Sequence, residues 1–134
     1  HVIHRRQRQM CIRDSTLGLE DRVTFLGLVS DMPHFYQSLN VFCLPSLQEG
    51  FPLSTLEAQA CGVPCIASDV GAVKETLCPQ TSALVEPNKV PVLADALSQH
   101  LSEIPRSPRA HILKHFDIRN MVNRYAMLAQ GENL

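Results

Sequence analysis

Short apolar runs alternate with helical patterns along most of this chain, and this alternation is the feature that most constrains its fold. Each run is only three to five residues long, as expected for strands buried on both faces of a parallel sheet. The predicted strands are 23–26, 41–44, 63–67 and 83–85. The alternation predicts an α/β fold, a Rossmann-like open parallel sheet with helices on both faces.

Helix signals fill the intervals between these predicted strands. Asp31 can cap a helix that has Pro33 in its first turn and runs to about Leu39. Pro52 stands at the start of a second helix, which Gly62 ends. The remaining predicted helices are 73–77, 90–101, 109–116 and 118–130.

The charge of the chain is unevenly distributed. The formal net charge is −1 over 134 residues, yet residues 1–13 carry four arginines and no acidic residue. These arginines have no aromatic partners and no fold pattern around them, so we predict no nucleic-acid partner. Residues 1–15 are an unassigned basic arm, whose string QMCIRDS resembles translated non-native sequence. Residues 16–134 are predicted to form one partial domain, with C-terminal helices from about 106.

Glu49 and Glu57 stand eight positions apart, around a turn and a predicted helix start. Carboxylates accept hydrogen bonds from vicinal hydroxyls, and the unpaired amides at a helix N-terminus hold phosphate. The arrangement therefore suits a ligand in which a sugar, a diphosphate and a ribose follow one another. The same residue types fit a buried strand, a turn and an amphipathic helix with two solvated glutamates.

Two candidate ligand loops follow predicted strands. Residues 45–51 follow one strand and residues 68–72 follow the next. Ligands of open parallel sheets bind outside the carboxyl ends of the strands, so both loops lie where such a fold holds a nucleotide. Gly62 and Gly71 also fit simple turns, and for Gly62 a turn is the preferred interpretation.

Two residue pairs have a spacing that metal sites use. His111 and His115 are four positions apart on a predicted helix, while Cys61 and Cys65 flank a helix stop and a strand start. The histidine pair has no evident third ligand, so we expect a solvated helix face there. The residues between the two cysteines already account for that segment as a helix stop and a strand entry, so no metal is expected at either pair. The five cysteines are odd in number and lack a Cys-x-x-Cys pair, which favours unpaired thiols in a reducing cytosol.

Three segments resemble the retaining glycosyltransferases of the GT-B type, in the large family that includes many sucrose, lipopolysaccharide and mannosyl transferases. They are LGLEDRVTFLGLVSD (17–31), VFCLPSLQEGFPLSTLEAQACGVPCIASDVGAVKE (41–75) and ALVEP (83–87). The segments agree with the family in order and spacing and include its Glu-x7-Glu motif. The resemblance identifies the chain with the C-terminal, nucleotide-sugar-binding half of a GT-B fold, incomplete at its N-terminus.

The resemblance also implies roles for the residues of the motif. Glu49, the candidate catalytic residue, would contact hydroxyls of the transferred sugar as an orienting acceptor, and Glu57 would take the two ribose hydroxyls. Between them, backbone groups would meet the sugar and the diphosphate, at Gly50, Phe51, Leu53 and Ser54. Pro52 stands where many relatives have glycine, and that position has no N–H to donate.

The function implied is transfer of a sugar from a nucleoside-diphosphate sugar to an acceptor, with retention at the anomeric carbon. The acceptor would bind a separate N-terminal domain, and no metal or other cofactor is expected where cationic side chains neutralise the leaving diphosphate. The acceptor domain and the cationic side chains are missing from this sequence, so we expect a fragment that does not turn over substrate by itself. We also expect its open sheet edge to promote self-association. The implied location is the cytoplasm, and the full-length protein could associate peripherally with the inner face of the membrane. The alternative is a non-catalytic nucleotide-binding α/β module or an epimerase-like relative.

Overall fold

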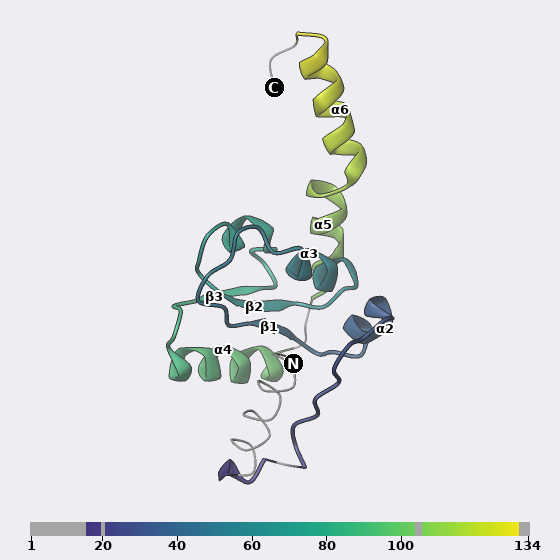
Figure 1. Cartoon of the computed structure of the whole chain (residues 1–134). Helices are drawn as coiled ribbons and strands as arrows, with labels where there is room; N and C mark the ends of the chain where they lie inside the picture. Colours follow the sequence, from purple (N-terminus) through teal and green to yellow (C-terminus); the bar gives the residue numbers. More distant parts are fainter. Residues whose placement is uncertain (1–15, 20, 104–105, 132–134) are drawn as a thin grey trace, which may run out of the picture. The chain divides into compact units, whose positions relative to one another are not determined.

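The computed structural model describes residues 16–19, 21–103 and 106–131. The chain divides into two compact units, His1–Ser30 and Asp31–Leu134 (Figure 1). The basic arm 1–15 lies outside the described residues.

The described part of the first unit contains no strand. Residues 23–26, predicted as a strand, have irregular backbone. A strand exists only where a neighbouring strand supplies hydrogen-bond partners, and the strands of the described sheet pair only with one another. Leu26 and Leu28 are exposed, at 58% and 100%. The strand prediction was wrong, because an apolar pattern reports propensity and not the presence of a pairing partner.

The second unit is built on a three-stranded parallel sheet with the order β1–β2–β3. The strands are Phe42–Leu44 (β1), Cys65–Ser68 (β2) and Ala83–Val85 (β3). Phe42 is aligned with Cys65, and Ile66 is aligned with Ala83. The open parallel sheet predicted from the alternation is confirmed.

Helices connect the strands close to the predicted positions. They are Met32–Gln37 (α2), Leu53–Ala60 (α3), the 3₁₀ helix Val73–Thr76 (η1), Val90–Ser102 (α4), Arg109–His115 (α5) and Ile118–Ala129 (α6). Asp31 caps α2, since its side chain accepts the His34 N–H at 3.2 Å. Gly62 follows α3 with φ at 93°, a left-handed conformation that favours glycine. The turn predicted at Gly62 is confirmed.

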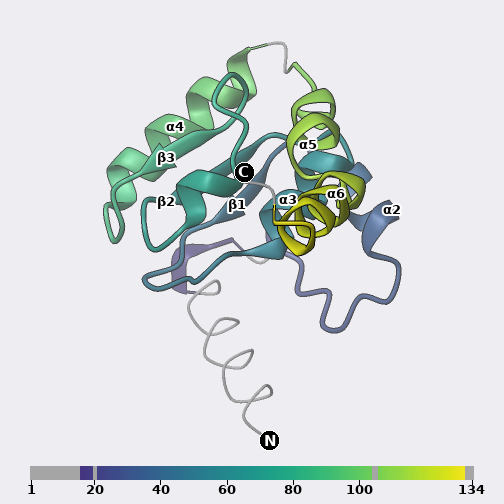
Figure 2. The same cartoon turned by 90° about the horizontal axis from the view of Figure 1, so that it is seen from above.

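Helices α3 and α4 cover opposite faces of the sheet (Figures 1 and 2). Helix α3 packs against β1 and β2, while α4 packs against β2 and β3. The predicted arrangement of helices on both faces is therefore confirmed. Because α3 leads from the end of β1 to the start of β2, its N-terminus lies at the carboxyl ends of the strands.

The core of the second unit gathers around the central strand β2, whose four residues are all buried. Side chains from α2, α3, η1 and the residue after η1 complete it, including Tyr36, Ala58, Val73 and Leu77. The residues of β1 are only half-buried. Burial is therefore deepest at the central strand.

A buried polar network ties α3 to the segments that surround it. The side-chain amide nitrogen of Gln59 donates to the carbonyl oxygens of Thr55 at 2.8 Å and Thr76 at 2.7 Å. Its side-chain oxygen accepts from the Cys78 N–H at 2.7 Å and from Ser82 Oγ at 3.3 Å. The hydroxyls of Thr55 and Thr76 are 2.7 Å apart and also hydrogen-bonded. Every donor and acceptor of the buried Gln59 amide is satisfied, and α3 is fixed to η1 and to the segment before β3.

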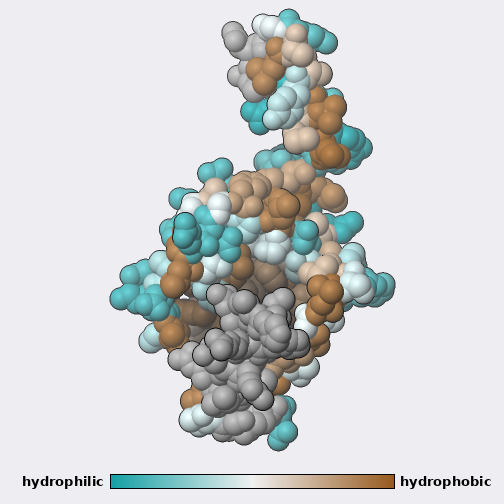
Figure 3. Space-filling model, in the orientation of Figure 1, coloured by the Kyte–Doolittle hydropathy of each residue, from teal (hydrophilic) through white to brown (hydrophobic). Residues whose placement is uncertain are grey.

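Helix α5 packs against α3, and α6 continues the chain beyond it (Figure 1). The Arg109 guanidinium donates to the carbonyl of Ala60, the last residue of α3. Helix α6 has no buried residue, and Figure 3 shows hydrophobic residues on the surface of the C-terminal helices. Its exposed large apolar side chains are Ile118, Met121, Val122, Tyr125, Met127 and Leu128. Within the described ranges, no helix has the length and apolar character that crossing a membrane requires.

Replacement of Gln59 tests the buried network. Gln59→Ala leaves two carbonyls, one N–H and one hydroxyl without this partner, and an unsatisfied buried group costs about 1–3 kcal/mol. We expect the free energy of unfolding in urea to fall by more than about 3 kcal/mol. Gln99→Ala on the exposed face of α4 is the control and should change it by less than about 0.5 kcal/mol. Equal small changes in both variants would contradict the stabilising role of the network.

Candidate functional site

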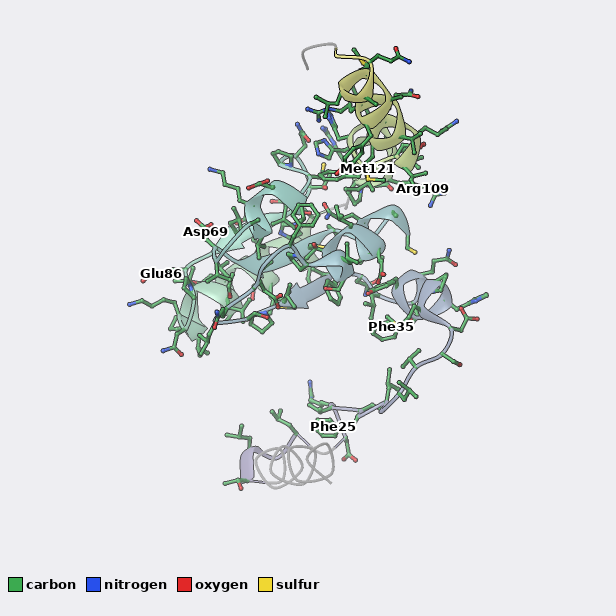
Figure 4. All side chains as sticks on the ribbon, turned by 45° about the horizontal axis from the view of Figure 1, so that its top comes forward. Phe25, Phe35, Asp69, Glu86, Arg109 and Met121 are labelled. Atoms are coloured by element: carbon green, nitrogen blue, oxygen red, sulfur yellow. The ribbon has the colours of Figure 1, made fainter. Side chains whose placement is uncertain are left out.

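The candidate residues lie at the end of the sheet where its strands terminate. Figure 4 shows Asp69 and Glu86, which directly follow β2 and β3, at the same end of the sheet, with Phe35 of α2 at the other end. The Asp69 N–H donates to the Val85 carbonyl at 2.9 Å, which holds these two loop starts together. Both predicted ligand loops therefore begin at the edge where parallel sheets bind ligands.

The loops after β1 and β2 are in direct backbone contact. The Ala72 N–H donates to the Gly50 carbonyl at 2.9 Å. Gly71 has φ at 53°, and a Cβ at this position would lie 2.0 Å from the carbonyl oxygen of Glu49. Only glycine fits there, so Gly71 does more than make a turn. It sets the position of the backbone that carries Glu49.

Glu49 is half-buried in the loop before α3. Its Oε1 accepts a hydrogen bond from Ser46 Oγ at 2.7 Å. A hydroxyl three residues upstream thus limits the rotation of the carboxylate. The carboxylate can still accept further hydrogen bonds, since an ionised carboxylate has about four acceptor positions.

Helix α3 begins at Leu53, directly after Pro52, a buried N-cap residue that makes no side-chain capping hydrogen bond. Leu53 is 63% exposed and Ser54 is half-buried. The Thr55 hydroxyl donates to the Pro52 carbonyl at 2.8 Å and faces the core. The first-turn amides of α3 therefore lack a side-chain cap in the described part of the chain. An uncapped N-terminus with its positive dipole end is suited to an anion such as phosphate.

Glu57 lies one turn into α3 and is exposed to solvent. Its Oε2 accepts a hydrogen bond from the Tyr36 hydroxyl of α2 at 3.0 Å. Burial and the Glu57 carboxylate raise the pKa of Tyr36 to about 12, so the phenol is protonated at neutral pH. Tyr36 was not predicted as a site residue. A buried tyrosine needs a hydroxyl partner, but no pattern in α2 indicates a partner 21 positions away.

All six predicted site residues lie in the loop before α3 or in its first two turns. They are Glu49, Gly50, Phe51, Leu53, Ser54 and Glu57. The structure therefore brings them into one segment. Glu49 and Glu57 do not share a partner, since each accepts from its own hydroxyl donor.

A cavity of about 290 Å³ opens at the carboxyl ends of all three strands. Its lining includes Pro45 after β1, Ser68 at the end of β2 and Val85 at the end of β3. Glu86 and Lys89 also line it, and their side chains form an ion pair at 3.7 Å. None of the six predicted site residues lines this cavity, although Leu47 of the same loop does.

The two residue pairs with metal-like spacing are not part of a larger ligand cluster. The rings of His111 and His115 have centroids 4.5 Å apart, and partial burial, together with the nearby His115 and Lys114 charges, lowers the pKa of His111. Cys65 is fully buried, and burial raises the pKa of its thiol to about 12. Across the residues that the structure describes, no group of three or more His, Cys, Asp or Glu side chains could hold a metal ion.

Comparison with known proteins identifies one family. The family model described as glycosyl transferases group 1 matches residues 4–103. The match begins within the basic arm. The resemblance found from the sequence pattern begins later, at Leu17. The chain is 35% identical over 97 residues to a lipopolysaccharide core biosynthesis mannosyltransferase of Rhizobium meliloti (strain 1021). That alignment covers 70% of this chain and 28% of the relative.

Solved structures show the same fold. Sucrose-phosphate synthase of Thermosynechococcus elongatus matches with a TM-score of 0.83 and 30% identity, over 94% of this chain and 34% of that one. The Anabaena protein HepE, solved in complex with UDP, matches with a TM-score of 0.85 over 92% of this chain and 36% of that one. Its identity of 23% makes this a likeness of fold. The predicted Rossmann-like α/β fold is confirmed, and the chain spans about a third of the length of these proteins.

The contact between the two loops can be tested at Gly71. Gly71→Ala places a methyl group against the Glu49 carbonyl in a left-handed conformation, so the free energy of unfolding should fall by about 1–3 kcal/mol. Gly50→Ala is the matched control, because its added methyl group meets open space. It should cost less than about 0.5 kcal/mol. Equal losses in the two variants, measured by urea denaturation, would show that the close approach at Gly71 is unimportant.

Proposed function

This chain belongs to the group 1 glycosyl transferases, and we propose that it is the donor-binding part of a retaining enzyme with the GT-B fold. One observation carries the proposal. Two carboxylates, each held by a hydroxyl, flank the uncapped N-terminus of α3 at the carboxyl end of a parallel sheet. In the complete protein this part would be the C-terminal half.

The donor would be a nucleoside-diphosphate sugar lying along the start of α3. Glu57 would accept the two ribose hydroxyls, and Glu49 would accept hydroxyls of the sugar. Between them, the amides of Leu53 and Ser54 would meet the diphosphate, and backbone groups of Gly50 and Phe51 would lie beside the sugar. The order of the three ligand parts thus follows the order of acceptors and donors along the chain.

The reaction proposed is breakage of the bond between the anomeric carbon and the diphosphate oxygen. The diphosphate leaves with the bonding electron pair, the acceptor oxygen bonds to the anomeric carbon on the same face, and the proton of the acceptor hydroxyl passes to the leaving diphosphate oxygen. Negative charge grows on the leaving diphosphate, and fixed N–H groups at a helix N-terminus stabilise it without reorganisation. Glu49 orients the sugar in this scheme and forms no covalent bond to it.

The acceptor is proposed to bind to a part of the protein outside this chain. Further cationic groups that neutralise the diphosphate are proposed to lie there as well. The mannosyltransferase and sucrose-phosphate synthase that it resembles are about three times as long, which supports a second domain. The thiols of the described cysteines are unpaired, which supports a cytoplasmic setting. The match to transferases favours this function over a non-catalytic nucleotide-binding module or an epimerase-like relative.

The two glutamates should be separable by calorimetric titration. UDP, ADP and GDP are first compared, and the one that binds most tightly is used as the nucleoside-diphosphate ligand. The second ligand is the hexose conjugate of that nucleoside diphosphate. Glu57→Gln should weaken both ligands about tenfold to a hundredfold, because hydrogen bonds to a charged group are worth about 1.5–3 kcal/mol. Glu49→Gln should weaken only the hexose conjugate and leave the nucleoside diphosphate nearly unchanged.

Glu103→Gln, at the exposed end of α4, is the matched control and should bind both ligands as the unchanged chain does. The proposal fails if neither Glu57→Gln nor Glu49→Gln changes either affinity. The two glutamates would then be solvated charges beside a helix.

A further inference from the structure

The Tyr36 hydroxyl holds the carboxylate that is proposed to bind ribose. It donates to Glu57 Oε2 at 3.0 Å. Tyr36 is 2% exposed, whereas Glu57 is exposed on α3. A buried donor thus meets an acceptor at the surface. The two residues come from different helices, α2 and α3.

The position of this hydroxyl is set by packing. The Tyr36 ring meets Phe42 edge to face, with centroids 5.5 Å apart and planes at 81°. It also lies 5.5 Å from the Phe35 ring and belongs to the buried core with Ala58 and Val73. A ring enclosed on several sides cannot change rotamer without disturbing the core. The hydroxyl is therefore a fixed point to which Glu57 is attached.

The Tyr36 hydroxyl also stays protonated. Burial is the largest cause that raises the pKa of Tyr36 to about 12, and the Glu57 carboxylate adds to it. The phenol therefore remains a neutral donor throughout the neutral pH range. A donor that occupies Oε2 from the protein side leaves Oε1 and the remaining acceptor position of Oε2 for a ligand.

We infer that Tyr36 is a positioning residue that makes this site selective for nucleotides with both ribose hydroxyls. An unrestrained glutamate loses rotamer freedom when it binds a vicinal diol, and this loss weakens binding. The bond from Tyr36 imposes part of this order before the ligand arrives. The inference rests on the proposed function, because it needs Glu57 to be the ribose acceptor.

The test compares Tyr36→Phe with Tyr125→Phe in the 134-residue chain. Both variants lose one phenolic hydroxyl, but Tyr125 is 67% exposed on α6. Calorimetry measures the affinity for the tightest binder among UDP, ADP and GDP and for its 2′,3′-dideoxy analogue. Tyr36→Phe should reduce the preference for the ribose form by about threefold to tenfold, through weaker binding of that form alone. Tyr125→Phe should leave the preference unchanged.

A double variant shows whether Tyr36 acts through Glu57. In the Glu57→Gln background, Tyr36→Phe should produce no further change in the ribose preference. A further change of the same size as in the unchanged chain would overturn the positioning role. So would an equal loss of affinity for the ribose and dideoxy ligands in Tyr36→Phe, since that would show a general effect on the fold.

Other outcomes separate this inference from the function on which it rests. If Glu57→Gln abolishes the ribose preference but Tyr36→Phe keeps it, the result supports the proposed function and contradicts the positioning role of Tyr36. If the unchanged chain does not distinguish ribose from dideoxyribose, Glu57 is not the ribose acceptor and both fall. Three-bond couplings of the Glu57 side chain by NMR need no variant: one dominant rotamer supports the role, and averaging among rotamers overturns it.

Discussion

The buried hydrogen bonds of Gln59 are the interaction on which the rest of the structure depends. The six predicted site residues all lie in helix α3 or in the loop that precedes it. Apolar packing alone would allow a short helix to slide or rotate on the sheet. The Gln59 amide removes this freedom, because its four hydrogen bonds have directions as well as distances. The start of α3 is thereby held in one place relative to the strand ends.

The two carboxylates are ordered by a second set of contacts, and both of these involve hydroxyl groups. Ser46 restrains Glu49 from within the loop, and Tyr36 restrains Glu57 from the core. In each case the donor precedes its carboxylate in the chain. The result is a surface whose hydrogen-bond acceptors are oriented before any ligand binds, and such preorganisation reduces the entropy lost on binding.

The sequence predicted the parts of the molecule that depend on local patterns. Apolar runs at 41–44 and 63–67 correspond to β1 and β2, and the glutamate motif lies where the alternation of elements places it. What it did not predict depends on contacts distant in the chain. Tyr36 and Glu57 are 21 positions apart, and Gln59 and Ser82 are 23 apart, so neither pairing leaves a periodic signal. The run at 23–26 fails for the converse reason: it has the local pattern of a strand but no described strand beside it.

Given the proposed sugar contact of Glu49, the backbone contact at Gly71 has a consequence for how donor preference changes among related chains. Two backbone segments this close cannot approach each other further, because closely packed atoms resist compression. A change that bends residues 69–72 toward the first loop is therefore expected to displace the Glu49 carbonyl as well. Sugar selectivity in such a site can then drift through residues that never touch the sugar, while the glutamates themselves stay unchanged.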